Sequence, residues 1–122
     1  MSKAKNTVSA ADALLFDAFI AKWQAKFSLG DWRIERGNKQ AKNAMASVEF
    51  NPPARLAVYR LGDFGAEEIT PASLEACVVH ELLHVLLFDL IQTASGKSTD
   101  EELEAAEHRC INVLEKLLKD SA

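Results

Sequence analysis

The sequence predicts an α+β fold in which one helix comes first, three short strands follow and two helices end the chain. Apolar residues recur at helical spacing over residues 9–28, 70–91 and 98–119. Between residues 32 and 61, apolar and polar residues alternate in short runs, as they do in half-buried strands. We find no internal repeat and no dividing linker, so we expect the 122 residues to form a single domain, with residues 1–8 disordered.

The composition is that of an ordinary globular protein, with 48% hydrophobic and 26% charged residues. The longest apolar run is interrupted by His84 and falls far short of the roughly 20 residues that a membrane span needs. The first residues include lysines, but the apolar segment of a secretion signal does not follow them. The two cysteines, Cys77 and Cys110, fit a reducing compartment. We therefore expect a cytoplasmic protein without membrane contact.

The first helix is expected to begin at Ser9, a favourable N-cap, and to end near Gly30. Strands are expected over residues 32–35, 44–50 and 55–61. They should form a short antiparallel or mixed sheet. Because they follow one another with short turns between them, an antiparallel meander is the simplest arrangement.

The second helix should begin at Thr70, whose hydroxyl caps it, with Pro71 in the first helical position. It is apolar nearly all the way round, so we expect it to lie at the centre of the domain. The last helix should begin at Ser98, which has the spacing of a capping box with Glu101. The sheet is then expected to pack on this central helix and on the C-terminal helix.

The central helix contains an HExxH motif, His80-Glu81-Leu82-Leu83-His84. Residues four apart lie on one face of a helix, about 5–6 Å apart, so His80 and His84 can bind the same metal ion. Glu81 lies at the edge of that face, where it can hold and deprotonate a water molecule. The alternative is that both histidines are core side chains. That alternative would bury the charge of Glu81 without a partner, which is costly, so the motif favours a divalent cation.

A catalytic zinc site needs a third protein ligand, which we expect from the last helix because it doubles back on the central helix. The candidates are Glu104, Glu107 and His108. The inward apolar stripe of this helix is predicted to comprise Leu103, Cys110, Leu114, Leu117 and Leu118. Glu107 falls inside the stripe, Glu104 at its margin and His108 beyond it. Glu107 is therefore favoured as the ligand, although it could instead pair with a nearby Arg or Lys, and Glu104 and His108 remain alternatives.

The segments VVHELLHVLL (78–87) and EHRCINVLEKLL (107–118) resemble those of small gluzincin-type zincin metallopeptidases. The resemblance is to compact phage and bacterial proteins of this type, and more distantly to the ImmA/IrrE and SprT-like proteins. It covers nearly the whole domain, from residue 32 to residue 118.

The resemblance implies a zincin-like α-β-β-β-α-α core around the HExxH helix. It also implies one zinc ion per chain at His80, His84 and Glu107, with Glu81 as the catalytic general base. Larger gluzincins have an aspartate four residues after the glutamate ligand, whereas this sequence has Ile111 there.

The expected function is zinc-dependent hydrolysis of peptide bonds in the cytoplasm of a bacterium or a phage-infected cell. The expected partner is a peptide or protein substrate that lies extended along the sheet edge. One alternative is a non-enzymatic, zinc-stabilised interaction module. Another is a DNA-associated SprT-like protease, because residues 31–61 carry six Lys and Arg against three acidic residues. A solvated sheet face explains that basic segment more simply than a nucleic acid partner does.

Overall fold

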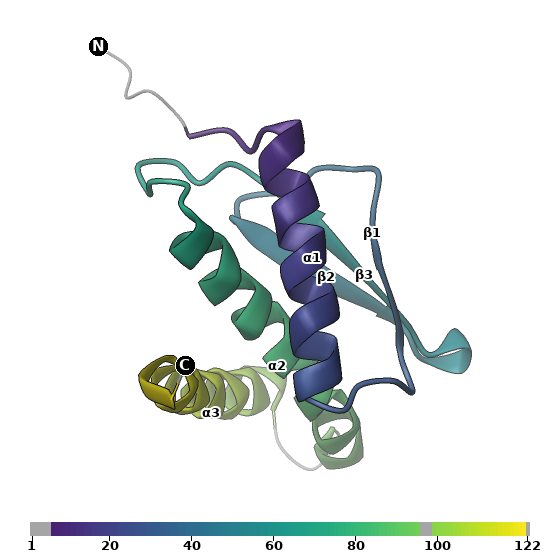
Figure 1. Ribbon diagram of the computed structural model, residues 1–122. Helices are drawn as coiled ribbons and strands as arrows, with labels where there is room; N and C mark the ends of the chain where they lie inside the picture. Colours follow the sequence, from purple (N-terminus) through teal and green to yellow (C-terminus); the bar gives the residue numbers. More distant parts are fainter. Residues whose placement is uncertain (1–5, 96–98, 122) are drawn as a thin grey trace.

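The computed structural model describes residues 6–95 and 99–121, with side chains as far as residue 119. It has an α+β fold with three helices and a three-stranded mixed sheet in these residues, in the expected order α-β-β-β-α-α (Figure 1). The elements are α1 (Ala10–Lys26), β1 (Arg33–Arg36), β2 (Ala46–Asn51), the short 3-10 helix η1 (Pro52–Ala54), β3 (Leu56–Leu61), α2 (Pro71–Ala94) and α3 (Asp100–Ser121).

The predicted caps of the first two long helices are confirmed. The Ser9 hydroxyl accepts a hydrogen bond from the Asp12 backbone N–H at 3.1 Å and forms a capping box at the start of α1. The Thr70 hydroxyl accepts from the Ser73 backbone N–H at 3.0 Å at the start of α2. Helix α1 ends at Lys26, two residues before the expected end at residue 28, and the chain turns before Gly30, with Ser28 in the left-handed region at φ 56°.

The expected start of α3 and the expected disorder of the N-terminal segment both fall partly outside the described residues. Ser98 lies outside the described residues; the capping contacts form at the next residue, where the Thr99 hydroxyl accepts from the Glu102 backbone N–H at 3.1 Å. Residues 1–5 of the segment expected to be disordered lie outside the description as well. Asn6, the first described residue, forms an antiparallel bridge with Gly65.

The sheet is mixed, which is one of the two expected kinds, but its order is β1-β3-β2, so the predicted antiparallel meander is wrong. β2 and β3 form an antiparallel pair, but β1 pairs with β3 in parallel. The segment 37–45 therefore crosses the end of β3 to reach the opposite edge of the sheet. This crossing is tight: the Ala41 N–H donates to the Leu61 carbonyl at 2.9 Å, and a Cβ at Gly62 would lie 2.1 Å from the Ala44 carbonyl oxygen. A glycine at position 62 makes the close approach sterically feasible.

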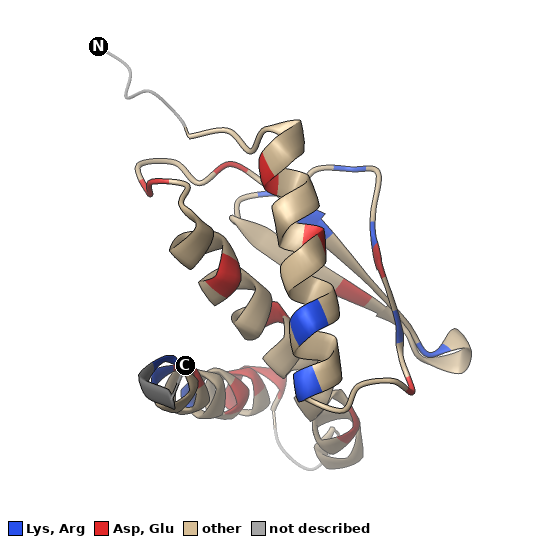
Figure 2. Cartoon of the chain, in the orientation of Figure 1, with Lys and Arg blue, Asp and Glu red and all other residues tan. Residues whose placement is uncertain are grey.

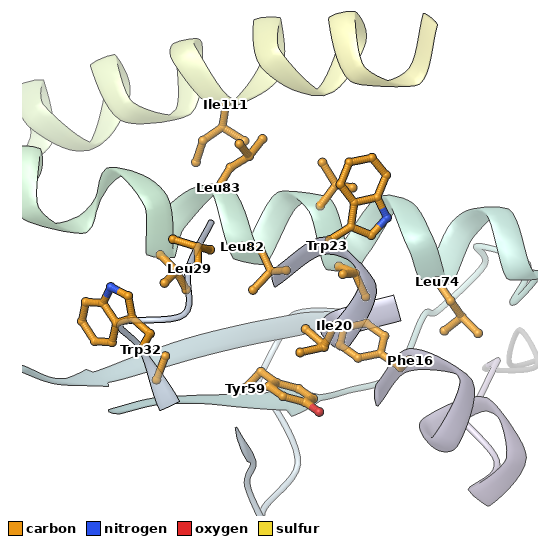
Figure 3. Packing of buried hydrophobic residues seen from close by; sticks show 14 of the residues in the cluster. Phe16, Ile20, Trp23, Leu29, Trp32, Tyr59, Leu74, Leu82, Leu83 and Ile111 are labelled. Atoms are coloured by element: carbon orange, nitrogen blue, oxygen red, sulfur yellow. The ribbon is translucent and has the colours of Figure 1, made fainter. Parts of the chain in front are cut away.

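Helices α1 and α2 pack on the same face of the sheet. Phe16 of α1 contacts Tyr59 of β3 with ring centroids 5.5 Å apart, and Phe88 of α2 stacks on Phe50 of β2 at 4.3 Å. Phe50 and Tyr59 share one face because Phe50 pairs with Ala57, two residues from Tyr59. The third helix then packs on α2, as Figure 3 shows where Ile111 points toward a leucine of α2. α2 is thus the central helix, as predicted, but the expected packing of the sheet on the C-terminal helix is wrong, because α1 lies beside α2 on the sheet and α3 packs on α2.

The buried face of α3 differs from the predicted stripe. Ile111 is fully buried, whereas Cys110 and Leu117, which were placed inward, are exposed. Successive residues are about 100° apart around the axis of a helix. The buried face of α3 is rotated from the predicted face by somewhat less than this angle. The rotation turns His108 toward α2.

The arginines of the basic segment 31–61 are all paired with acidic side chains. Each of its four arginines contacts a carboxylate: Arg33 pairs with Glu35, Arg36 with Asp17, Arg60 with Glu49, and Arg55 with Asp31 and Asp89. Figure 2 shows Lys and Arg interspersed with acidic residues along this part of the chain. This pairing fits the expected solvated sheet face. In the described part of the chain, no helix is both long and apolar enough to cross a membrane.

The rotation of α3 predicts unequal effects of two truncations on that helix. Ile111→Ala should lower the free energy of unfolding by about 2–5 kcal/mol, because it opens a cavity in the α2–α3 contact. Val113→Ala is the matched control: its side chain is 54% exposed, and the change should stay within about 0.5 kcal/mol. Urea denaturation of both variants would measure the difference. Equal effects would contradict the observed face.

Candidate metal centre

The HExxH motif lies in the middle of α2, where the helix passes under α3 and alongside β2. His80 and His84 are one turn apart with ring centroids 5.1 Å from each other, so they share a face as predicted. Both imidazoles are half-buried rather than enclosed in the core. The alternative interpretation, in which both histidines are core side chains, requires them to be fully buried, so the structure disfavours it.

Helix α3 adds a third imidazole to this pair. His108 lies with its ring centroid 5.1 Å from that of His84 and 6.0 Å from that of His80. One nitrogen from each of the three rings can be chosen so that all lie within 4.8 Å of one another. Three histidines gathered in this way can hold a metal ion.

The Nδ1 atom of every one of these imidazoles faces an oxygen. Nδ1 of His84 lies 2.9 Å from a carboxylate oxygen of Glu107, and Nδ1 of His80 contacts the carboxylate of Glu115. Nδ1 of His108 lies 3.0 Å from the Glu104 backbone carbonyl oxygen. A carbonyl or ionised carboxylate can only accept a hydrogen bond, so each Nδ1 donates. In the neutral imidazoles, the lone pair available to a metal is then on Nε2.

The three candidates for the third ligand are therefore placed differently. Glu107 faces α2, as expected from its position, and contacts the Nδ1 side of His84. Glu104 has an exposed side chain and contributes through its carbonyl oxygen. His108 belongs to the group of three imidazoles.

Sequence reasoning missed Glu115. A signal for it existed, because Glu107, Ile111 and Glu115 follow one another at intervals of four residues and therefore lie along one face of α3. The predicted stripe reached Glu107 on this face but did not extend to Ile111 and Glu115, because it was centred toward Cys110 and Leu117.

Glu81 is the one buried charged or polar residue of the described core, at 7% exposure. Burial raises the pKa of its carboxyl to about 8, and the nearby charge of Glu115 adds a smaller contribution in the same direction. Within the described residues its carboxylate forms no hydrogen bond or ion pair with another side chain. Its accessible part borders the cleft that also contains the three histidines.

That cleft has a volume of about 690 Å³ and lies between β2, α2 and α3. The side chains of Val48 and Phe50 form its strand side, and Phe88, Ile91 and Leu103 make its helical walls partly apolar. A polar centre bordered by apolar walls is the usual composition of a ligand site. The arrangement can hold a cation, a nearby carboxylate and an extended ligand in one place.

Comparisons with protein-family models, with curated proteins and with solved structures found no match to this chain.

Cys77 precedes His80 by one turn, and its environment predicts low reactivity. Burial raises the pKa of its thiol from 9.0 to about 11, with Glu81 and Glu115 adding smaller contributions. The thiolate fraction at neutral pH should fall about 100-fold, and alkylation requires the thiolate. Iodoacetamide should therefore modify Cys77 in a Cys110→Ser protein about 100-fold more slowly when native than in urea.

The matched control is a Cys77→Ser protein, in which the exposed Cys110 should react at similar rates in both states. Equal native and denatured rates for Cys77 would contradict the shielding of its thiol.

Proposed function

We propose that this protein is a zinc-dependent metallopeptidase of the zincin type, in which His80, His84 and His108 bind the zinc ion and Glu81 is the general base. The observation that carries the proposal is the shared orientation of the three imidazoles. Each Nδ1 is occupied by an oxygen acceptor, and a nitrogen from each ring lies within 4.8 Å of the others. Metal-binding histidines commonly donate their second ring N–H in this way.

The donor set fits zinc. Three imidazoles from protein and one position left for solvent or substrate form a known catalytic zinc arrangement. The set contains no thiolate, and all three imidazoles line an open cleft, which is a feature of catalytic rather than structural sites. When bound, zinc supplies Lewis acidity, which lowers the pKa of water toward about 7 and polarises a carbonyl oxygen.

We favour His108 over Glu107 as the third ligand. Glu107 already accepts a hydrogen bond from His84 on the Nδ1 side of that ring, at 2.9 Å. The Nδ1 atom of His108 is occupied by a backbone carbonyl oxygen, and a nitrogen of this ring lies within 4.8 Å of a nitrogen of each of the other two imidazoles. The site then resembles an all-histidine zinc site rather than the His-His-Glu site of gluzincins.

Glu81 supplies the proton transfer in this proposal. Its carboxylate oxygen accepts a proton from the attacking water and then passes it to the nitrogen of the leaving amine. The residue suits this task because it lies next to His80, borders the cleft and is not engaged by another side chain in the described residues.

The edge of β2 offers a place for the substrate backbone. Met45 accepts a hydrogen bond from the Gly62 N–H, so alternate residues from Met45 onward pair with β3. The backbone groups of Ala46, Val48 and Phe50 then point away from β3, toward the side where no described strand pairs. An extended peptide can add to this edge through main-chain hydrogen bonds.

Metal binding tests the ligand set. Wild-type protein should bind one zinc ion per chain, measured by elemental analysis after gel filtration and by competition with a chelator. His80→Ala, His84→Ala and His108→Ala should each weaken binding at least about tenfold, because each removes one of three protein donors. Full zinc binding by the His108 variant, together with its loss in Glu107→Ala, would overturn the choice of third ligand.

Activity tests the assignment of Glu81. Glu81→Gln is nearly isosteric but cannot accept a proton, so it should keep the zinc and lose peptide cleavage by a factor of about 10² or more. A peptide library digested by wild-type protein and analysed by mass spectrometry provides the readout. A wild-type protein that binds zinc but cleaves nothing in the library would favour the non-enzymatic zinc module instead.

A further inference from the structure

We infer that Glu107 and Glu115 are positioning residues that hold His84 and His80 in the orientation needed for metal binding. This inference rests on the metal site proposed above and assigns two carboxylates that lie outside the ligand set. Neither carboxylate needs to touch the metal for this role. Each acts through the ring to which it is hydrogen-bonded.

The contacts form an antiparallel ladder between the two helices. His80 of α2 contacts Glu115 of α3, and His84 contacts Glu107. Ile111 lies between the two carboxylates in sequence and is fully buried. It points toward Leu83, which lies between the two histidines, in Figure 3. One apolar contact flanked by two imidazole–carboxylate contacts therefore sets the register of α3 on α2.

The chemistry of each polar contact selects one form of the ring. An ionised carboxylate has no proton to donate, so a neutral imidazole must donate its Nδ1–H. The ring is then held in the tautomer whose lone pair is on Nε2, and it cannot rotate without breaking the hydrogen bond. The negative charge of the carboxylate also makes Nε2 of the ring a stronger ligand for a metal cation.

The two contacts differ in burial. The side chains of His84 and Glu107 are 17% and 14% exposed, whereas those of His80 and Glu115 are 32% and 31% exposed. A charged hydrogen bond is screened less where water is excluded. Loss of Glu107 should therefore cost more metal affinity than loss of Glu115.

His108 provides an internal reference. Its Nδ1 donates to the backbone carbonyl of Glu104, which no side-chain substitution at that position removes. The Nδ1–H form of His108 should persist when either carboxylate is truncated. If each substitution changes the tautomer of only one histidine, the effect is due to positioning of that ring. A general loss of structure would change all three rings.

The experiment uses Glu107→Ala and Glu115→Ala, with Glu107→Gln and Glu115→Gln as conservative variants. Glu101→Ala is the matched control, since it removes the same charge from an exposed position of α3. Zinc affinity is measured by chelator competition. The tautomers are read from ¹⁵N NMR of the metal-free proteins at pH 8.5, where histidine is ordinarily neutral.

We expect each Ala variant to lose zinc affinity about 10- to 100-fold, with the larger loss for Glu107→Ala. Each Gln variant should recover part of the loss, because its amide oxygen can still accept the hydrogen bond. Only His84 should lose its Nδ1–H preference in Glu107→Ala, and only His80 in Glu115→Ala. The control should match wild type in both measurements.

Unchanged affinity and unchanged tautomers in both Ala variants would overturn the inference, and so would an affinity loss without the tautomer change. Failure of the wild-type protein to bind zinc would instead refute the proposed function. Even then, the tautomers of the metal-free protein would show whether the two carboxylates hold the rings.

Discussion

The burial of polar side chains on α2 is the constraint on which the rest of the structure depends. The helix is central and mostly apolar, yet it carries His80, Glu81 and His84 in its middle turns. Polar groups removed from water are destabilising unless they find partners. Helix α3 meets this requirement by placing Glu107 and Glu115 against the two imidazoles, while Glu81 remains at the cleft. The docking of α3 is thus both a packing contact and the completion of a site.

The sheet supports the same arrangement from the other side. Because β1 pairs in parallel with β3, the second strand is left at the edge that borders the cleft. A meander in chain order would have placed the second strand in the middle, with partners on both sides. The crossing segment 37–45 and the bare backbone of Gly62 are the local features that permit the observed order. The position of β2 at the edge of the sheet is therefore a consequence of topology.

Features with short-range causes could be predicted from the sequence, and features with tertiary causes could not. The caps at Ser9 and Thr70 depend on hydrogen bonds within one turn, and the shared face of His80 and His84 follows from helical geometry alone. Which strands pair depends on contacts across the domain, which a short alternating pattern does not encode.

The prediction of which face of α3 is buried was wrong for a related reason. Apolar residues spread over more than one side of this helix, since Cys110 and Leu117 are exposed while Ile111 is buried. The pattern alone therefore did not select one face. Only the packed structure turns His108 toward α2 and brings Glu115 to His80.

Three glutamates lie around the same imidazoles, and their different surroundings give them different chemical properties. Glu107 and Glu115 are each engaged by an Nδ1–H, so their oxygens are committed to holding a ring. Glu81 has no such partner among the described side chains, is more buried and borders the cleft. In the proposed mechanism, Glu81 is therefore the carboxylate that exchanges a proton, while Glu107 and Glu115 hold the rings of His84 and His80.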